Sequence, residues 1–470
     1  MARPVLLLAV VAIACKREAP TAAGSGSPQA TPAAADPCSK ASIAPPGSGA
    51  MAWIADDYPA ALACAKSRKV PLVLDLWAPW CHTCLSMQST VFTDPSFHED
   101  RPRFVYAALD TDREVNAAAI ARFPPSAWPT FYVVGPDEAV LARFVGSASV
   151  AQFHAFLESG QQALAGGAAG ADARLLGAER ATALKDYKTA DEELTAAVAA
   201  APPDWVRLPD ALTSLISTKQ REGDVAGCLD VAETFLDRTG NTAAASDFLV
   251  TAMDCAKPQE KAAADRVLAL RTRALARWQA LLADAKAPLS IDDRSDALAS
   301  MRETLDELGR TDEAKATAER QRQLLDDAAA KAPTPSAAST YNWHRAEVYV
   351  YLGRPLDVVE ALAKSARDLP GEYDPLARLG WVYLKAGKLD EARAWTDKAL
   401  ALVYGPRKAR LLTQRAEIAQ RQHDKVGEKQ ARTALVALLT SLPPGQANPD
   451  ALAKAKAQLA DLDSGSGSGP

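Results

Sequence analysis

The sequence predicts an α/β domain followed by an all-α solenoid of helix pairs. Residues 70–77 form a short apolar run that ends shortly before a Cys-x-x-Cys pair, as buried strands of α/β proteins do. From about residue 171 onward strand signals vanish, and alanine-rich amphipathic runs alternate with short Gly or Pro breaks. Matching residues recur there at a fixed spacing, which is typical of stacked helical repeats.

The composition agrees with this division and excludes some classes of function. A chain of 470 residues is too long for one hydrophobic core, so two or more domains are expected. The 53 Lys and Arg against 58 Asp and Glu give a net charge of −5, which excludes a strongly basic nucleic-acid-binding protein. Hydrophobic residues make up 48% and aromatic residues only 6%, a difference filled largely by alanine, which favours helix.

The N-terminus predicts export. Residues 1–14 contain an apolar run that is too short to span a bilayer but suits a signal peptide. Cys15 follows Ala-Ile-Ala and resembles the lipid-modified cysteine of bacterial lipoproteins, although Ala12 stands where that family usually has Leu. The resemblance implies a lipid anchor on the periplasmic side of a bacterial membrane; the alternatives are a plainly secreted protein and an uncleaved start. Residues 15–50, rich in Pro, Ala, Gly and Ser, are interpreted as a flexible tether.

The α/β domain is expected over residues 51–160. Its strands are predicted at residues 70–77, 104–110, 128–134 and 139–146, with a closing helix over 150–157. Cys81 and Cys84 lie between the first strand and a helical stretch. Backbone N–H groups at the start of a helix stabilise a thiolate, and the i,i+3 spacing lets both sulfurs close a small disulfide. The pair therefore predicts redox chemistry.

Three motifs in order make the resemblance specific. Residues 75–84, Asp-Leu-Trp-Ala-Pro-Trp-Cys-His-Thr-Cys, resemble the active-site stretch of the thioredoxin superfamily, and residues 128–130, Trp-Pro-Thr, resemble its cis-proline loop. Residues 91–95, Val-Phe-Thr-Asp-Pro, are similar to the C-terminal periplasmic thioredoxin domain of DsbD-type disulfide reductases. The resemblance covers roughly a quarter of the chain.

The resemblance implies a role for each matching residue. Cys81 would be the nucleophile, partly exposed at the helix N-terminus, and Cys84 the more buried resolving thiol. Asp75 matches a buried acid that takes or gives the Cys84 proton, the alternative being a surface residue at a strand end. Pro129 is expected to be cis and to present backbone to a bound substrate.

Four further residues are expected around the cysteines. Trp80 and Trp128 would flank the site as apolar surface, and packing alone is the other interpretation of Trp128. His82 and Thr83 replace the Gly-Pro of ordinary thioredoxins. A cationic or hydrogen-bonding His82 would stabilise the thiolate and raise the reduction potential; otherwise it is a solvated bystander.

The sequence predicts neither a metal nor a cofactor. A lone Cys-x-x-Cys pair is half of a zinc site, but no second cysteine pair has ligand spacing. Leu85 follows Cys84 where covalent haem attachment needs His. Flavin and nicotinamide fingerprints are absent from the sequence, so an upstream protein must supply electrons to the cysteines.

The second half of the chain contains residues that recur at a fixed spacing. Tyr349 and Tyr383 are 34 residues apart, as are Gly353 and Gly387, and the unit around Gly380 resembles the tetratricopeptide repeat. Only residues 339–405 match clearly, and degenerate units extend the array over 171–440. Residues 441–470 are expected to be a C-terminal helix and a disordered tail. Stacked helix pairs form a surface for protein or peptide partners; the alternative is that the array only packs on the thioredoxin-like domain as a spacer.

Four cysteines remain. In an oxidising compartment Cys228 is expected to pair with Cys255 and Cys38 with Cys64, the alternative being four small buried thiols. Separations of Cα atoms above about 7 Å would exclude either bond.

These observations together predict an exported, membrane-tethered thiol:disulfide oxidoreductase that acts on a protein disulfide, resembling protein-disulfide reductases. A specialised reductase for haem-protein maturation would differ only in its substrate. The alternative from another class is an interaction or scaffold lipoprotein whose thioredoxin fold is a redox-silent binding module.

Overall fold

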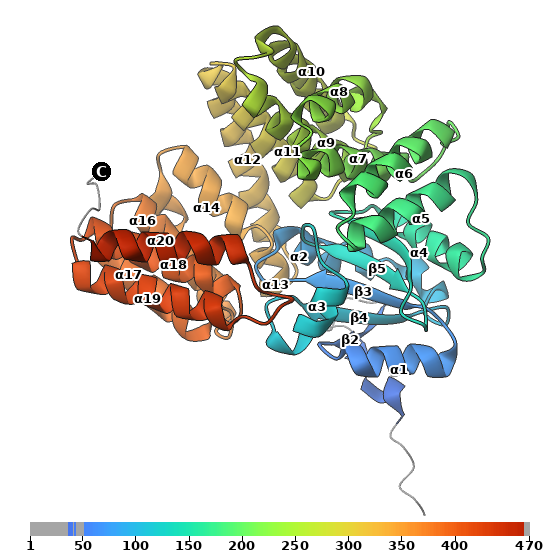
Figure 1. Cartoon of the computed structure of the whole chain (residues 1–470). Helices are drawn as coiled ribbons and strands as arrows, with labels where there is room; N and C mark the ends of the chain where they lie inside the picture. Colours follow the sequence, from blue (N-terminus) through green and yellow to red (C-terminus); the bar gives the residue numbers. More distant parts are fainter. Residues whose placement is uncertain (1–35, 41, 44–50, 465–470) are drawn as a thin grey trace, which may run out of the picture. The chain divides into compact units, whose positions relative to one another are not determined.

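The computed structural model describes residues 36–40, 42–43 and 51–464. The predicted signal peptide, Cys15, most of the tether and the last six residues therefore lie outside the described residues. The described residues up to 164 form what we call the α/β domain, and residues 170–463 form the helical array (Figure 1).

Six strands form one mixed sheet in the order β1-β2-β4-β3-β5-β6. Strands β2, β4 and β3 run parallel, whereas β5 and β6 continue the sheet antiparallel and β1 pairs antiparallel with β2. The strands are β1 (Ser42–Ile43), β2 (Ala52–Ala55), β3 (Leu72–Trp77), β4 (Val105–Asp110), β5 (Thr130–Val134) and β6 (Val140–Val145). The four strands predicted from the sequence are confirmed, with ends moved by at most two residues; β1 and β2 were not predicted.

Both faces of the sheet are covered, which explains why its strands are almost wholly apolar. On one face Leu72, Leu74 and Leu76 of β3 pack with α1 and α3. On the other, Val73 and an aromatic cluster that includes Phe131 pack with α2 and α4. The side chain of β3 that interrupts this pattern is the carboxylate of Asp75.

The helices α1, α2 and α4 of the α/β domain begin at side-chain caps. Asp57 caps α1 (Tyr58–Arg68), and Cys81 itself caps α2 (His82–Ser89). A capping box between Ser149 and Gln152 starts α4, which runs from Val150 to Leu164 and so exceeds its predicted length by seven residues. The short helix α3 spans Ala117–Arg122.

The helical array consists of sixteen α-helices within the described residues. They are α5 (Gly170–Ala183), α6 (Tyr187–Ala200), α7 (Leu208–Glu222), α8 (Val225–Phe235), α9 (Ala243–Ala256), α10 (Ala264–Ala283), α11 (Ile291–Glu307), α12 (Thr311–Lys331), α13 (Pro335–Ser339), α14 (Asn342–Tyr351), α15 (Val359–Asp368), α16 (Tyr373–Lys385), α17 (Leu389–Leu402), α18 (Arg407–Arg421), α19 (Lys425–Ser441) and α20 (Pro449–Asp463). None of the helices in the described part of the chain has the length and apolar character needed to cross a membrane.

The glycines of the repeat units shape the backbone and the helix contacts of the array. Gly353 and Gly387 follow α14 and α16 with the same φ of 73°, a left-handed conformation that glycine adopts without strain. Gly380 lies where α16 meets α17, and a Cβ atom there would come within 2.5 Å of Thr396 Oγ1. The absence of a side chain at this position therefore lets the two helices approach closely.

A buried arginine joins the helical array to the α/β domain. Arg207, 3% exposed, donates to Glu179 on α5 and Asp210 on α7, at 3.0 and 2.9 Å. Its guanidinium also donates to the backbone carbonyl of Arg143 on β6. One side chain thus ties the first helices of the array to an edge strand of the sheet.

Candidate active site

The two active-site cysteines lie at the N-terminus of α2 and are joined by a disulfide, with Cα atoms 5.2 Å apart. The backbone N–H of Cys84 donates to Cys81 Sγ at 3.0 Å. In the dithiol state the same N–H and the positive end of α2 would stabilise a thiolate on Cys81. The first cysteine is therefore held in the position where a helix favours negative charge.

Asp75 lies in the centre of the sheet, paired in register with Ala108 on one side and Phe131 on the other. Only 2% of the residue is exposed, and its Oδ1 has no hydrogen-bond partner. Burial raises the pKa of Asp75 to about 8. The alternative of a surface residue at a strand end is wrong, and the carboxyl can change protonation near neutral pH.

The indole ring of Trp80 packs against the cysteines, and the ring of Trp128 packs against Trp80. The Trp128–Pro129 peptide bond is cis, and Trp128 donates its indole N–H to Thr111 Oγ1 at 2.7 Å. Trp80 donates to Asp112 at 2.7 Å, and the two ring centroids are 5.2 Å apart. Each indole is thus fixed by a hydrogen bond to the segment that follows β4.

The helical array packs on this side of the α/β domain. The sequence allowed such packing as the alternative to partner binding, but it did not predict which face is covered. Arg407 places its guanidinium 4.3 Å from the Trp80 ring, and Arg378 donates to the Trp80 carbonyl. Further contacts come from Tyr373 to Asp112, Tyr404 to Asp110 and Gln446 to the Thr111 carbonyl.

This cover corrects the expected exposure of the nucleophile. Cys81 was expected to be partly exposed, but it is 4% exposed, and Cys84 is 1% exposed. Helix α2 packs against α11 and α13, so its N-terminus does not face open solvent. The expectation fails because it considers the α/β domain without the array.

His82 joins the two parts of the molecule through charge. Its Nδ1 lies 2.9 Å from Asp292 Oδ2 on α11, and Thr83 Oγ1 lies 3.3 Å from the same nitrogen. Burial lowers the pKa of His82, but the carboxylates of Asp292 and Asp296 outweigh this effect and raise it above its usual value. His82 is therefore not a solvated bystander.

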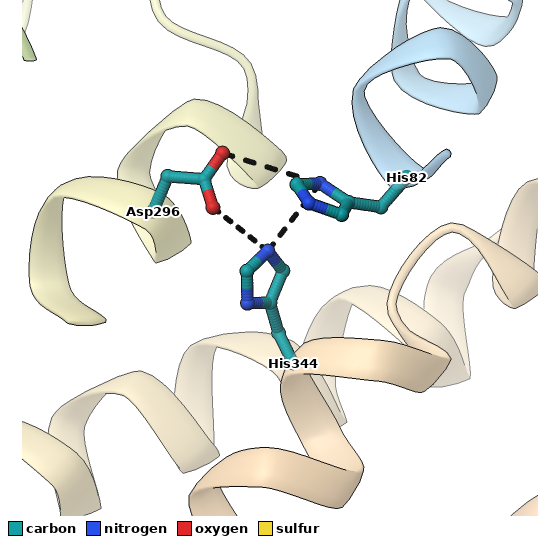
Figure 2. A group of neighbouring side chains, drawn as sticks. All are labelled: His82, Asp296 and His344. Carbon is teal, nitrogen blue, oxygen red and sulfur yellow. Dashed lines mark hydrogen bonds and ion pairs between the residues drawn. The ribbon is translucent and has the colours of Figure 1, made fainter. Parts of the chain in front are cut away.

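A second histidine adjoins the first. His344 on α14 places Nε2 2.8 Å from Asp296 Oδ1 and 3.3 Å from His82 Nδ1 (Figure 2). Burial lowers its pKa, yet Asp296 and Glu347 raise that pKa to about 10. The sequence gave no prediction of a metal site, because the prediction rested on cysteine spacing alone. No pattern in the residues near His344 or Asp296 indicates that they lie next to His82.

A cavity of about 250 Å³ opens next to the cysteine motif. Thr83, Trp128 and Gly146 of the α/β domain form one wall, and α7, α9 and α11 of the helical array form the other. The acidic side chains of the second wall are Asp247, Asp293 and Asp296. Burial raises the pKa of Asp247 to about 8 and that of Asp293 to about 6, whereas the neighbouring histidines hold the pKa of Asp296 below its usual value. At neutral pH the negative charge of this wall therefore lies mainly on Asp296 and Asp293.

The structure brings together the other cysteines that the sequence proposed as pairs. Cys38 and Cys64 are disulfide-bonded with Cα atoms 4.9 Å apart. Cys228 on α8 and Cys255 on α9 are bonded with Cα atoms 5.8 Å apart, and both are buried. Both separations are below the limit of about 7 Å for a disulfide.

The comparison with protein-family models gives one match, a thioredoxin-like family over residues 52–136. The α/β domain is thioredoxin-like. Among solved structures, the chain resembles a tetratricopeptide repeat protein from Parabacteroides merdae, with 15% identity, a TM-score of 0.40 and coverage of 62% of this chain and 98% of that one.

Two further solved structures are similar to the chain. One is PilW, a type IV pilus biogenesis factor, with 17% identity, a TM-score of 0.31 and coverage of 51% and 97% of the two chains. The other is PilF of Pseudomonas aeruginosa, with 16% identity, a TM-score of 0.28 and coverage of 53% and 97%. The comparison with curated proteins gave no match.

Proposed function

We propose that the protein is a thiol:disulfide oxidoreductase whose working group is the Cys81–Cys84 pair. The observation that carries this proposal is the pairing of these cysteines at the N-terminus of α2 with the buried carboxyl of Asp75 on the adjoining strand. Its pKa of about 8 allows Asp75 to hold or release a proton near neutral pH.

In the reducing direction, the Cys81 thiolate attacks one sulfur of a substrate disulfide and the other sulfur leaves as a thiolate. The Asp75 carboxylate then accepts the proton of the Cys84 thiol, and Cys84 attacks Cys81 Sγ. The second substrate thiolate leaves, the substrate has gained two electrons, and Cys81–Cys84 is oxidised. A protein dithiol must return the two electrons. The reverse sequence oxidises a substrate dithiol.

Substrate reaches the pair through the cavity beside Thr83 and Trp128. A volume of about 250 Å³ suits a side chain or a short extended segment and is too small for a folded domain. The substrate is therefore a protein that presents its disulfide on an exposed segment, or one that displaces part of the helical array. The array is proposed to recruit this partner through its helical surface.

The proposal includes export and attachment to the periplasmic side of a bacterial membrane by lipid on Cys15. Support comes from the apolar run of residues 5–14 and the small residues before the cysteine. A clickable fatty acid should label the wild-type chain, and Cys15→Ser should abolish labelling and release the protein from membranes. Equal labelling of the two proteins would contradict the anchor.

The redox proposal is tested by trapping. Cys84→Ser leaves Cys81 able to attack but removes the thiol that resolves the mixed disulfide, so covalent adducts should accumulate on non-reducing gels. The matched control is the double variant in which Cys81 is also replaced by Ser. Adducts that are equally abundant in both variants, or absent from both, would refute the mechanism; mass spectrometry of the adducts identifies the substrate.

A second candidate is a scaffold protein whose α/β domain binds partners without redox turnover. The burial of Cys81 beneath the helical array favours it. In that case the double cysteine variant would keep every partner of the wild-type chain and all of its cellular function. Loss of function in the double variant with intact folding excludes this candidate.

A further inference from the structure

We propose that His82, Asp296 and His344 form a binding site for a divalent transition-metal ion, of which zinc is the simplest case. Figure 2 shows the three side chains turned toward one another from α2, α11 and α14. One ligand atom from each residue lies within 4.8 Å of the others. Two imidazoles and a carboxylate are the donor set of many zinc sites that keep one coordination position open.

The distances suit such an ion. His344 Nε2 lies 2.8 Å from Asp296 Oδ1 and 3.3 Å from His82 Nδ1, and His82 Nδ1 lies 4.0 Å from Asp296 Oδ2. Ligands about 2.0–2.1 Å from zinc in a tetrahedron are roughly 3.3 Å apart. The two ring nitrogens already have this separation, whereas the His344–Asp296 pair would have to widen by about 0.5 Å and the His82–Asp296 pair to close by about 0.7 Å.

The carboxylates around the two rings also favour a cation. His82 Nδ1 lies 2.9 Å from Asp292 Oδ2, and His344 Nε2 lies 2.8 Å from Asp296 Oδ1. The two ring nitrogens are themselves only 3.3 Å apart. One divalent ion between the nitrogens would therefore lie close to both carboxylates and offset their charge.

The surroundings are those of a supported metal site. His344 Nδ1 lies 3.7 Å from Glu347 Oε2, and Arg302 holds the Glu347 carboxylate at 3.1 Å. At 3.7 Å the buried Nδ1 of His344 has no hydrogen-bond partner within the described residues, but the Glu347 carboxylate lies on the side to which metal-bound histidines usually direct their second nitrogen. Asp292, 1% exposed, adds a negative charge beside His82. Cysteine spacing gave no hint of this site, because its ligands come from three distant parts of the chain.

An ion can reach the site from solvent. Asp296 has 37% of its side chain exposed and belongs to the acidic wall of the cavity beside Thr83. Because His82 stands between Cys81 and Cys84, a bound ion would connect the cysteine motif to α11 and α14 by coordination bonds. Metal binding would thereby fasten the helical array to the active-site helix.

The test uses the full chain without a histidine tag, stripped with EDTA and kept with its disulfides intact so that thiolates cannot bind metal. Titration with Co²⁺ should give one equivalent of tetrahedral cobalt by visible absorption, and Zn²⁺ should displace it. His82→Ala and Asp296→Asn replace partly exposed ligands and should each weaken Zn²⁺ binding by at least about 100-fold in calorimetry. Glu347→Gln, which leaves the ligands in place, should weaken it by about 10–100-fold.

His154→Ala is the matched control, because His154 also pairs with an aspartate, Asp100 at 3.0 Å, but lies outside the cluster. It should bind Zn²⁺ as the wild type does. Circular dichroism verifies that each variant is folded. Absence of a tetrahedral cobalt spectrum, or unchanged Zn²⁺ affinity in both His82→Ala and Asp296→Asn, would overturn the proposal. Because the disulfide stays closed, this result is independent of the trapping experiment.

Discussion

Replacing Asp75 by Asn should stabilise the protein, and by an amount that depends on pH. The carboxyl is 2% exposed, and burial raises its pKa from 3.8 to about 8. Between about pH 4 and pH 8 the unfolded chain has lost this proton while the folded chain keeps it. The folded state thus binds more protons, so its stability falls as the pH rises through this window.

The pKa shift sets the size of the effect. Each pKa unit corresponds to about 1.36 kcal/mol, so a shift of roughly four units corresponds to a penalty on the order of 5 kcal/mol above pH 8. Asn does not ionise and escapes this penalty, although its buried NH₂ group adds a cost of about 1 kcal/mol. We therefore expect Asp75→Asn to be more stable than wild type by several kcal/mol at pH 8.5 and slightly less stable at pH 4.

Urea unfolding of the oxidised proteins, followed by tryptophan fluorescence at several pH values, measures this difference. Asp94→Asn is the control: the hydrogen bonds from Ser96 lower the pKa of this exposed acid, so no stabilisation is expected there. If the free energies of unfolding of Asp75→Asn and wild type stay parallel from pH 4 to pH 8.5, Asp75 is not the titrating group. The same substitution should slow the resolving step by roughly 10²-fold or more, because a general base is lost.

Four further substitutions test contacts of the helical array. Gly387→Ala should destabilise the protein by about 1 kcal/mol through its φ of 73° alone. Gly405→Ala should destabilise it more, because its Cβ would overlap the Asp112 carbonyl, and it should also speed alkylation of the reduced active-site cysteines. Arg207→Ala should cost about 3–5 kcal/mol in urea unfolding, since it leaves a buried carboxylate unpaired. Gly380→Ala should cost about 1–3 kcal/mol by overpacking two helices of the array.

Each of these variants has a control variant that separates the proposed cause from a general effect. Gly387→Ala is the control for Gly405→Ala. Equal alkylation rates in the two would refute the role of the loop between α17 and α18, which contains Gly405, in covering the site. Arg266→Ala, which breaks only exposed ion pairs, should leave the stability nearly unchanged. Gly371, with no atom within 4 Å of a Cβ, is the neutral site for comparison with Gly380.

The sequence predicted the features that depend on local pattern. The apolar run that becomes β3, the cysteine motif that begins α2, and the helix-ending glycines at 353 and 387 all carry their signal within a few residues. Apolar runs and left-handed glycines result from burial and backbone sterics, which act locally. For the same reason the thioredoxin resemblance could be found from short motifs.

The features that could not be predicted from the sequence are contacts between segments far apart in the chain. His82 meets Asp292 and His344 across 210 and 262 residues, and each is a polar residue that looks like any solvated position on a helix. The burial of Cys81 likewise depends on contact with helices of the array. The apolar residues of those helices already pack within the array, so their pattern does not indicate a further contact, and the cysteine motif has no hydrophobic pattern that predicts one.

The helices that cover the active site are also made late in the synthesis of the chain. Gln446, which donates to the Thr111 carbonyl, follows that residue by 335 positions. A ribosome adding roughly 5–20 residues per second makes Thr111 about 15–70 seconds before it makes Gln446. Until then the nascent chain lacks this contact to the segment that follows β4. The cover over the active site is therefore completed only after the C-terminal helices have been made.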